Sequence, residues 1–141
     1  MRLKPAFLAL VAVQALHSTE EYVGRLYEVF PPARMVSGMI SGDLRRGFVV
    51  FNLALVCFGF WCYLFPVRRQ WPSAAAFAWA WVAIELVNGI GHPAWSIARG
   101  GYTPGLATAL VLLPLALAVA KRLISPSTPD PRTSPPSARL S

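Results

Sequence analysis

The chain has 141 residues, of which 55% are hydrophobic and 13% are charged, and it carries 13 Lys and Arg against 6 Asp and Glu. Soluble domains usually have about a quarter of their residues charged, so this chain has too little charge to cover a water-exposed globule. Its apolar content also excludes disorder over most of its length. A net charge of +7 would favour nucleic-acid binding in a soluble protein. Here the basic residues flank long apolar segments, so we predict an integral membrane protein without a nucleic-acid partner.

Four apolar segments follow one another along the chain, at about residues 5–22, 47–65, 73–97 and 104–120. Each is close to the ~20 residues that a helix needs to cross a hydrocarbon core of ~30 Å. The segments are continuously apolar and do not alternate, which excludes a transmembrane barrel. We therefore predict an all-α fold, a four-helix transmembrane bundle.

Two further segments complete the predicted organisation. The connection between the first and second spans, Gly24 to Arg46, mixes apolar and charged residues and is expected to lie in the membrane interface, broken at Pro31-Pro32. Residues 125–141 are rich in Pro and Ser, which predicts a disordered tail. Residues 1–124 are thus expected to form one membrane domain.

The basic residues favour one orientation of these spans. With four spans both termini lie on the same side of the membrane, and that side holds eight basic residues against five on the other. The positive-inside rule then places both termini in the cytoplasm. The alternative is that Arg2-Leu3-Lys4 and the first apolar segment form a secretory signal, which would leave three spans.

Polar side chains interrupt the first and third spans in two stripes. The first stripe consists of Gln14, His17, Glu20 and Glu21, and the second of Glu85, Asn88 and His92. At 100° per residue each set lies within about 120° of the helix circumference. Counting 1.5 Å per residue, His17 and Glu85 both lie ~18 Å from the side of the termini, and Asn52 of the second span lies at a similar depth. We expect the stripes to meet in one intramembrane site.

The cost of burying these groups favours a function over a purely structural role. An ionised residue at the centre of a membrane helix costs about 2.5–3.5 kcal/mol. Polar side chains also join transmembrane helices by hydrogen bonds, and for Asn52 alone this is the favoured interpretation. Three carboxyl groups at one depth cannot all remain ionised, so we expect a protonated acid beside an ionised one, which is an acid–base pair.

Backbone features predict a shaped cavity beside the stripes. Pro93 leaves the carbonyl group of Gly89 without its helical partner, next to Asn88 and His92. Such non-ideal backbone is tolerated at membrane depth only against protein or a polar cavity. Thr103 and Pro104 are typical of an N-cap and a first helical residue, so they predict the start of the fourth helix.

Three motifs carry a resemblance to a known family. His17-Ser18-Thr19-Glu20-Glu21 resembles the sequence that names the bacterial membrane-protein family with an HxxEE motif. His92 resembles the second histidine of that family, and Tyr102-Thr103-Pro104-Gly105 resembles its YxPG sequence. The resemblance covers about residues 5–123. The biochemistry of the family is uncharacterised, so the resemblance implies an intramembrane site in a bacterial inner membrane and leaves the reaction open.

We predict an intramembrane enzyme whose partners are the lipid bilayer and a lipophilic small molecule. The candidate catalytic residues are His17, Glu20, Glu21, Glu85, Asn88 and His92. One Glu would be a general base and another a protonated acid, without a cofactor, in the isomerisation or cyclisation of a terpenoid- or sterol-like substrate. Trp81 and Trp95, at the edges of the stripe, would stabilise a cationic intermediate.

Two alternatives to this function stay open. In a metal-dependent membrane hydrolase or oxidase, His17, Glu20 or Glu21, Glu85 and His92 would bind one or two divalent ions. In a proton-coupled carrier or an accessory membrane protein, the carboxyl groups would form a proton relay. Four spans without an internal repeat disfavour a carrier. The sequence leaves the oligomeric state open.

Overall fold

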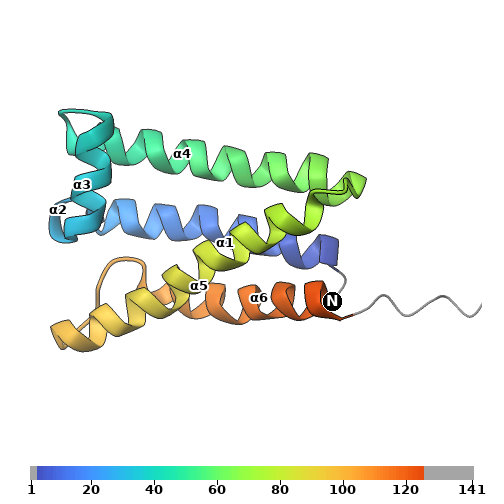
Figure 1. Ribbon diagram of the computed structural model, residues 1–141. Helices are drawn as coiled ribbons and strands as arrows, with labels where there is room; N and C mark the ends of the chain where they lie inside the picture. Colours follow the sequence, from blue (N-terminus) through green and yellow to red (C-terminus); the bar gives the residue numbers. More distant parts are fainter. Residues whose placement is uncertain (1–2, 126–141) are drawn as a thin grey trace, which may run out of the picture.

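The computed structural model describes residues 3–125, and every regular element in this part of the chain is a helix (Figure 1). The elements are α1 (Leu3–Val23), α2 (Leu26–Val29), α3 (Pro31–Ile40), α4 (Leu44–Cys62), η1 (Tyr63–Val67), α5 (Ala74–Arg99) and α6 (Leu106–Ile124). η1 is a π-helical turn that continues α4. The all-α prediction is confirmed. The predicted disordered tail lies, from residue 126 onward, outside the described residues.

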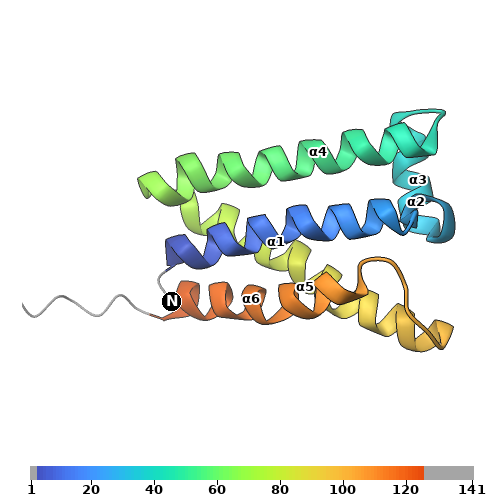
Figure 2. The same cartoon turned by 180° about the vertical axis from the view of Figure 1, so that it is seen from behind.

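The four long helices lie side by side in a bundle (Figures 1 and 2). α1 and α5 run in one direction, and α4 and α6 run in the opposite one. α5 crosses the others obliquely, from beside α4 to beside α6. The short helices α2 and α3 lie at the end of the bundle where α1 ends and α4 begins. Residues of α1 therefore have α4, α5 and α6 as neighbours.

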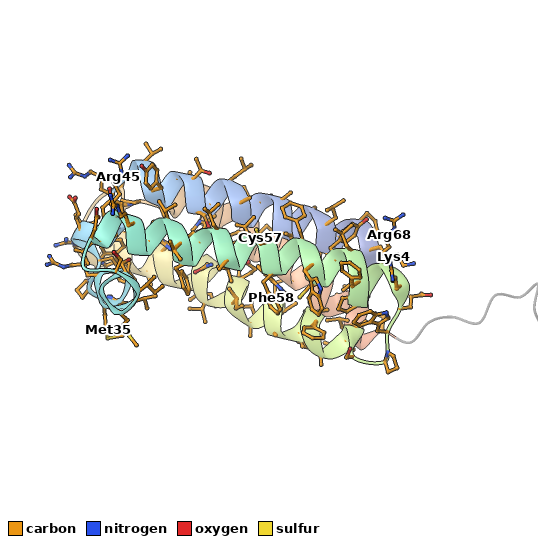
Figure 3. All side chains as sticks on the ribbon, turned by 90° about the horizontal axis from the view of Figure 1, so that it is seen from above. Lys4, Met35, Arg45, Cys57, Phe58 and Arg68 are labelled. Atoms are coloured by element: carbon orange, nitrogen blue, oxygen red, sulfur yellow. The ribbon has the colours of Figure 1, made fainter. Side chains whose placement is uncertain are left out.

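Three helices are long and apolar enough to cross a membrane, namely Leu44–Val67, Ala74–Arg99 and Leu106–Ile124. α1 has 21 residues, but its polar stripe lowers its mean hydropathy, and it is not among the three. Arg45 lies at the end of the bundle with α3, and Lys4 and Arg68 lie at the other end (Figure 3). Apolar side chains are exposed between these ends, for instance Val87 at 72%. This distribution indicates a membrane protein.

An apolar core fills the half of the bundle around the first turns of α1. Its buried members are Ala6, Phe7, Leu10, Val11, Cys62, Val67, Ala78, Trp81, Val82, Leu112, Ala116 and Val119. The face of α1 that enters this core continues at helical spacing as Gln14, His17, Ser18 and Glu21. The polar stripe is therefore buried because it extends the core-facing side of the same helix.

The predicted interfacial connection folds into α2 and α3. Pro31 is the first residue of α3, where its missing N–H group is not needed, so the predicted break lies directly before it. α3 packs closely on α4. A Cβ atom on Gly47 would lie only 2.0 Å from the carbonyl oxygen of Ser37, so the absence of a side chain at Gly47 permits this contact. Asp43 caps α4 by accepting a hydrogen bond from the backbone N–H of Arg46 at 3.2 Å. The connection thus covers the end of the bundle at which α1 and its polar stripe end.

Candidate functional site

Two histidines and one glutamate converge between α1 and α5. The Oε1 atom of Glu21 lies 3.3 Å from Nε2 of His17 and 3.1 Å from Nε2 of His92. The two imidazole rings are perpendicular, with their centroids 4.7 Å apart. The side chains are buried, with 0% of His17, 8% of Glu21 and 7% of His92 exposed. One ligand atom from each residue lies within 4.8 Å of the others, so this group could hold a metal ion.

Gly105 permits this convergence. Its φ is +90°, a conformation that residues with a Cβ atom rarely adopt. A Cβ atom at Gly105 would lie 2.6 Å from Cε1 of His92 and 2.9 Å from Cε1 of His17. The last residue of the YxPG sequence is therefore a glycine for both steric and conformational reasons.

Glu20 faces α6 and not the histidines. Its carboxylate accepts hydrogen bonds from the backbone N–H groups of Ala107 at 3.0 Å and Thr108 at 2.9 Å. The hydroxyl of Thr108 donates to it at 2.5 Å, and the hydroxyl of Tyr102 donates as well. The hydrogen bond to Glu20 raises the pKa of Tyr102 to about 12. Free N–H groups and the helix dipole favour a carboxylate at a helix N-terminus, so Glu20 of α1 caps α6.

This arrangement corrects the predicted start of the fourth helix. Thr103 is not the N-cap: α6 begins at Leu106, after Gly105, and the hydroxyl of Thr103 is hydrogen-bonded to that of Ser96. The physical reason is that α1 already supplies a carboxylate to the free N–H groups of α6. A residue from another helix cannot be recognised as a cap from local sequence.

A chain of hydrogen bonds links Glu20 to His17. Nδ1 of His17 lies 2.7 Å from the hydroxyl oxygen of Thr108. The single proton of that hydroxyl goes to Glu20, so the hydroxyl oxygen accepts from the Nδ1–H group of His17. Nε2 of His17 is then the nitrogen that faces Glu21. It makes no hydrogen bond within the described residues.

Glu85 and Asn88 belong to a separate polar row beside this centre. Nδ2 of Asn88 lies 3.4 Å from Oε2 of Glu85 and 3.3 Å from Oε1 of Gln14. With the Gln14 amide turned so that its nitrogen faces Glu85, that nitrogen lies 2.9 Å and 3.1 Å from the two carboxylate oxygens. Ser18 donates to Asn52 at 2.7 Å, and Asn52 donates to the carbonyl group of Phe48 at 3.0 Å. These bonds tie α5, α1 and α4 together.

The six predicted site residues therefore occupy three places. His17, Glu21 and His92 form the centre, Glu20 caps α6, and Glu85 and Asn88 lie in the polar row. Sequence reasoning missed Thr108, because a single threonine in an apolar span carries no signal. Its position in the first turn after the YxPG sequence was the one available indication.

The two tryptophans pack against other aromatic side chains. Trp81 packs in the apolar core, edge-on to Phe7 with ring centroids 6.4 Å apart. Trp95 packs on Phe30 with ring centroids 4.6 Å apart. Neither ring lines the cavity that adjoins the centre, and the role in stabilising a cationic intermediate stays a prediction. Indole rings fill space at helix contacts, which the stripe pattern does not distinguish from a cavity wall.

A cavity of about 290 Å³ adjoins Glu21 and His92. Its polar lining also includes Gln14, Ser37, Asn52 and Asn88. The remainder is mostly apolar and comes from α2, α3, α4 and α5: Leu26, Phe30, Pro32, Ala33, Val36, Phe48, Phe51, Leu55 and Ile84. Within the part of the chain that the structure describes, no Lys or Arg lines this cavity. Two residues of the centre, Glu21 and His92, therefore form part of the wall of a mostly apolar cavity.

Comparison with known proteins agrees with the motifs. The model of a family described as "Protein of unknown function with HXXEE motif" matches residues 8–119. No curated protein and no solved structure matches the chain. The matched segment includes the motif on α1, His92 on α5 and the YxPG loop, which together build the centre. Since the match spans most of the chain, the protein belongs to the HXXEE-motif family.

Proposed function

We propose that the protein is an intramembrane enzyme that performs acid–base chemistry on an uncharged, lipophilic small molecule at the His17–Glu21–His92 centre. One observation carries this proposal: the cavity that adjoins Glu21 and His92 is otherwise lined by apolar and uncharged side chains. Concave, mostly apolar pockets with a few convergent polar groups are typical of small-molecule sites. Its volume of about 290 Å³ suits a small substrate or one end of a longer one.

The lining favours an uncharged substrate. A phosphate or carboxylate group in this cavity would find no Lys or Arg among the described residues that line it, and an unpaired buried charge is costly. An apolar body would lie against Phe51, Leu55 and Ile84, with its reacting group toward Glu21. A terpenoid- or sterol-like molecule with a double bond, hydroxyl or carbonyl group meets both requirements.

Each polar group has a role in this proposal. Glu21 lies between two imidazoles and is placed to exchange a proton with the substrate. Asn88, which also lines the cavity, would orient a substrate oxygen through its amide group. Glu85 lies behind Asn88 as the second carboxyl group. Double-bond isomerisation or acid-initiated cyclisation is the reaction class that we propose.

We also propose that α1 is a fourth transmembrane span. Gln14, His17 and Glu21 of its polar stripe are buried, and Glu20 is bonded to the N-terminus of α6. The exposed Leu16 and Val23 are apolar. A helix whose polar groups face the bundle interior is compatible with lipid. Four spans place both termini on one side, and the distribution of basic residues favours the cytoplasmic side of a bacterial inner membrane. α2 and α3 would then lie in the opposite interface.

The experiment is an activity screen with variants that fill the cavity. Full-length protein in detergent is incubated with a membrane lipid extract, and the neutral lipids are followed by mass spectrometry. We expect one neutral component to be converted by the wild type and by Leu117→Trp, a control at an exposed site on α6. We expect Leu55→Trp to block conversion and Glu21→Gln to slow it about 100-fold or more. An unchanged extract, or a fully active Glu21→Gln protein, would overturn the proposal.

A further inference from the structure

We infer that His17, Glu21 and His92 form the binding site of one divalent transition-metal ion, with a further coordination position open toward the cavity. The role of the ion rests on the proposed function. The binding of the ion does not rest on the proposed function, because binding depends only on three side chains and the groups that hold them.

The two distances from Glu21 to the imidazoles match those between neighbouring ligands of a tetrahedral ion. Zn²⁺ binds imidazole nitrogen and carboxylate oxygen at about 2.0–2.2 Å, and neighbouring ligands of a tetrahedron are about 1.6 bond lengths apart, or about 3.3 Å. Oε1 of Glu21 lies 3.3 Å from Nε2 of His17 and 3.1 Å from Nε2 of His92. All three ligand atoms lie within 4.8 Å of one another, so small side-chain adjustments would place an ion between them.

The hydrogen bonds of His17 support the same conclusion. Its Nδ1–H group donates to Thr108, which in turn donates to Glu20, so Nε2 is the ring nitrogen that remains to face Glu21 and an ion. Histidines that bind metals almost always donate their other N–H group to such an acceptor, which fixes the tautomer and the orientation of the ring. Glu20 and Thr108 thus form the outer support of the ligand His17, anchored on the N-terminus of α6.

A purely structural ion pair explains less of the geometry. One protonated histidine would suffice to compensate Glu21, yet two perpendicular imidazoles approach the same carboxylate oxygen. Position 105 is a glycine, and a Cβ atom there would collide with both imidazole rings. Nε2 of His17 and Nδ1 of His92 are buried and make no hydrogen bond within residues 3–125. A cation at Nε2 of His17 would satisfy the first of these atoms.

The donor set indicates which ions fit. Imidazole and carboxylate ligands suit Zn²⁺ and Fe²⁺, whereas Mg²⁺ and Ca²⁺ prefer oxygen ligands alone. Three protein ligands with an open position are typical of catalytic sites. Glu85 does not belong to the converging group, so the site holds one ion and not two. When bound, the ion would supply a Lewis acid or an activated water beside the cavity, and in that form the water, and not the ligand Glu21, would exchange the proton.

The two glutamates of the motif have different roles at this metal site. Glu21 is the ligand, and Glu20 is a positioning residue that acts through Thr108 and His17. Adjacent residues on a helix point about 100° apart, so one reaches α5 and the other reaches α6. Both glutamates of the motif thus contribute to the same centre, Glu21 as a ligand and Glu20 through Thr108 and His17.

The test is metal analysis of the full-length protein, purified in detergent through a tag without histidines and without chelators. We expect about one equivalent of zinc or iron per chain by plasma mass spectrometry. Glu85→Gln, a buried acid outside the group, is expected to keep the metal. His92→Ala and Glu21→Gln are expected to lose it while eluting as the wild type does in size-exclusion chromatography.

Cobalt substitution gives a second readout that does not depend on activity. Co²⁺ added to the chelated protein is expected to give the intense visible absorption of a four-coordinate site in the wild type and in Glu85→Gln, and to raise their Tm. Neither change is expected in His92→Ala.

The outcomes separate this inference from the proposed function. A wild-type protein that holds no zinc, iron or cobalt after each is added overturns the metal site, as does a His92→Ala protein that keeps a full equivalent. If lipid conversion then persists with a chelator present, the acid–base enzyme stands without an ion. If the metal is stoichiometric but no lipid is converted, the metal site stands and the proposed function falls.

Discussion

The two halves of α1 enter the same bundle on the same face and are stabilised by different forces. In the first half Phe7, Leu10 and Val11 pack against Trp81 and other apolar side chains by shape alone. In the second half, His17 and Glu21 occupy the same helical positions and depend on hydrogen bonds and charge. In lipid the apolar half gains little from the hydrophobic effect, so close packing stabilises it. One face of a single helix, α1, thus contributes both to the apolar core and to the candidate site.

The largest effect is expected from breaking the apolar half. Trp81→Ala removes a fully buried ring that packs on Phe7 and is expected to lower the free energy of unfolding by about 3–5 kcal/mol. Because His17 and Glu21 lie further along α1, metal content per folded chain should not change. Thermal unfolding in detergent and metal analysis measure the two effects. Trp79→Ala, at a 41% exposed position on α5, is the control. Loss of metal in folded Trp81→Ala protein would show that the two halves are not independent.

A somewhat smaller loss of stability is expected at Gly105, together with loss of the centre. Gly105→Ala places a Cβ atom against both imidazoles and forces alanine to a φ of +90°. Strain and overpacking together are expected to cost about 2–4 kcal/mol and to abolish metal binding. Gly100→Ala is a matched control, because Gly100 has a φ of +71° and no atom near its Cβ position. Equal effects of the two substitutions would argue against the steric role of Gly105.

A moderate effect is expected from Glu20→Gln. The neutral amide cannot accept from all of its N–H and hydroxyl donors and does not complement the helix dipole of α6. We expect a loss of about 1–2 kcal/mol in stability. Metal affinity should fall about 10–100-fold without being abolished, because the support of His17 is weakened. Titration with Co²⁺ measures the affinity, and Glu28→Gln, an exposed acid paired with Arg25, is the control. Complete loss of metal would instead make Glu20 a ligand.

The smallest effect is expected from Asn52→Ala. Its hydrogen bonds with Ser18 and the carbonyl of Phe48 join α1 to α4. Such bonds between transmembrane helices contribute about 0.6 kcal/mol on average, and we expect a loss of this size with unchanged metal content. Thermal unfolding of the single and double variants with Ser18→Ala measures the coupling. A strong loss of metal binding would place Asn52 in the centre and remove the distinction between the polar row and the site.

Much of the candidate site could be anticipated from spacing. The polar residues of α1 and α5 share helical faces, and the structure brings His17, Glu21 and His92 within ligand distance of one another. The separation of Glu20 from Glu21 could not be anticipated, since both lie within the same stripe. It depends on where α6 begins, and this start is determined by Gly105 and by Glu20 itself. The packing of Trp81 in the apolar core could not be anticipated for a similar reason, because its neighbours come from other helices.

The sequence by itself determined that this is a membrane protein, that its fold is helical, and which of its residues are costly to bury. These follow from composition and from periods along one helix, which are local properties. Only the tertiary structure decided that Glu21 faces two histidines, that Glu20 caps α6, and that Glu85 lies apart from the centre with Asn88. Such pairings depend on the rotation and depth of neighbouring helices. Contacts between residues up to 91 positions apart set both.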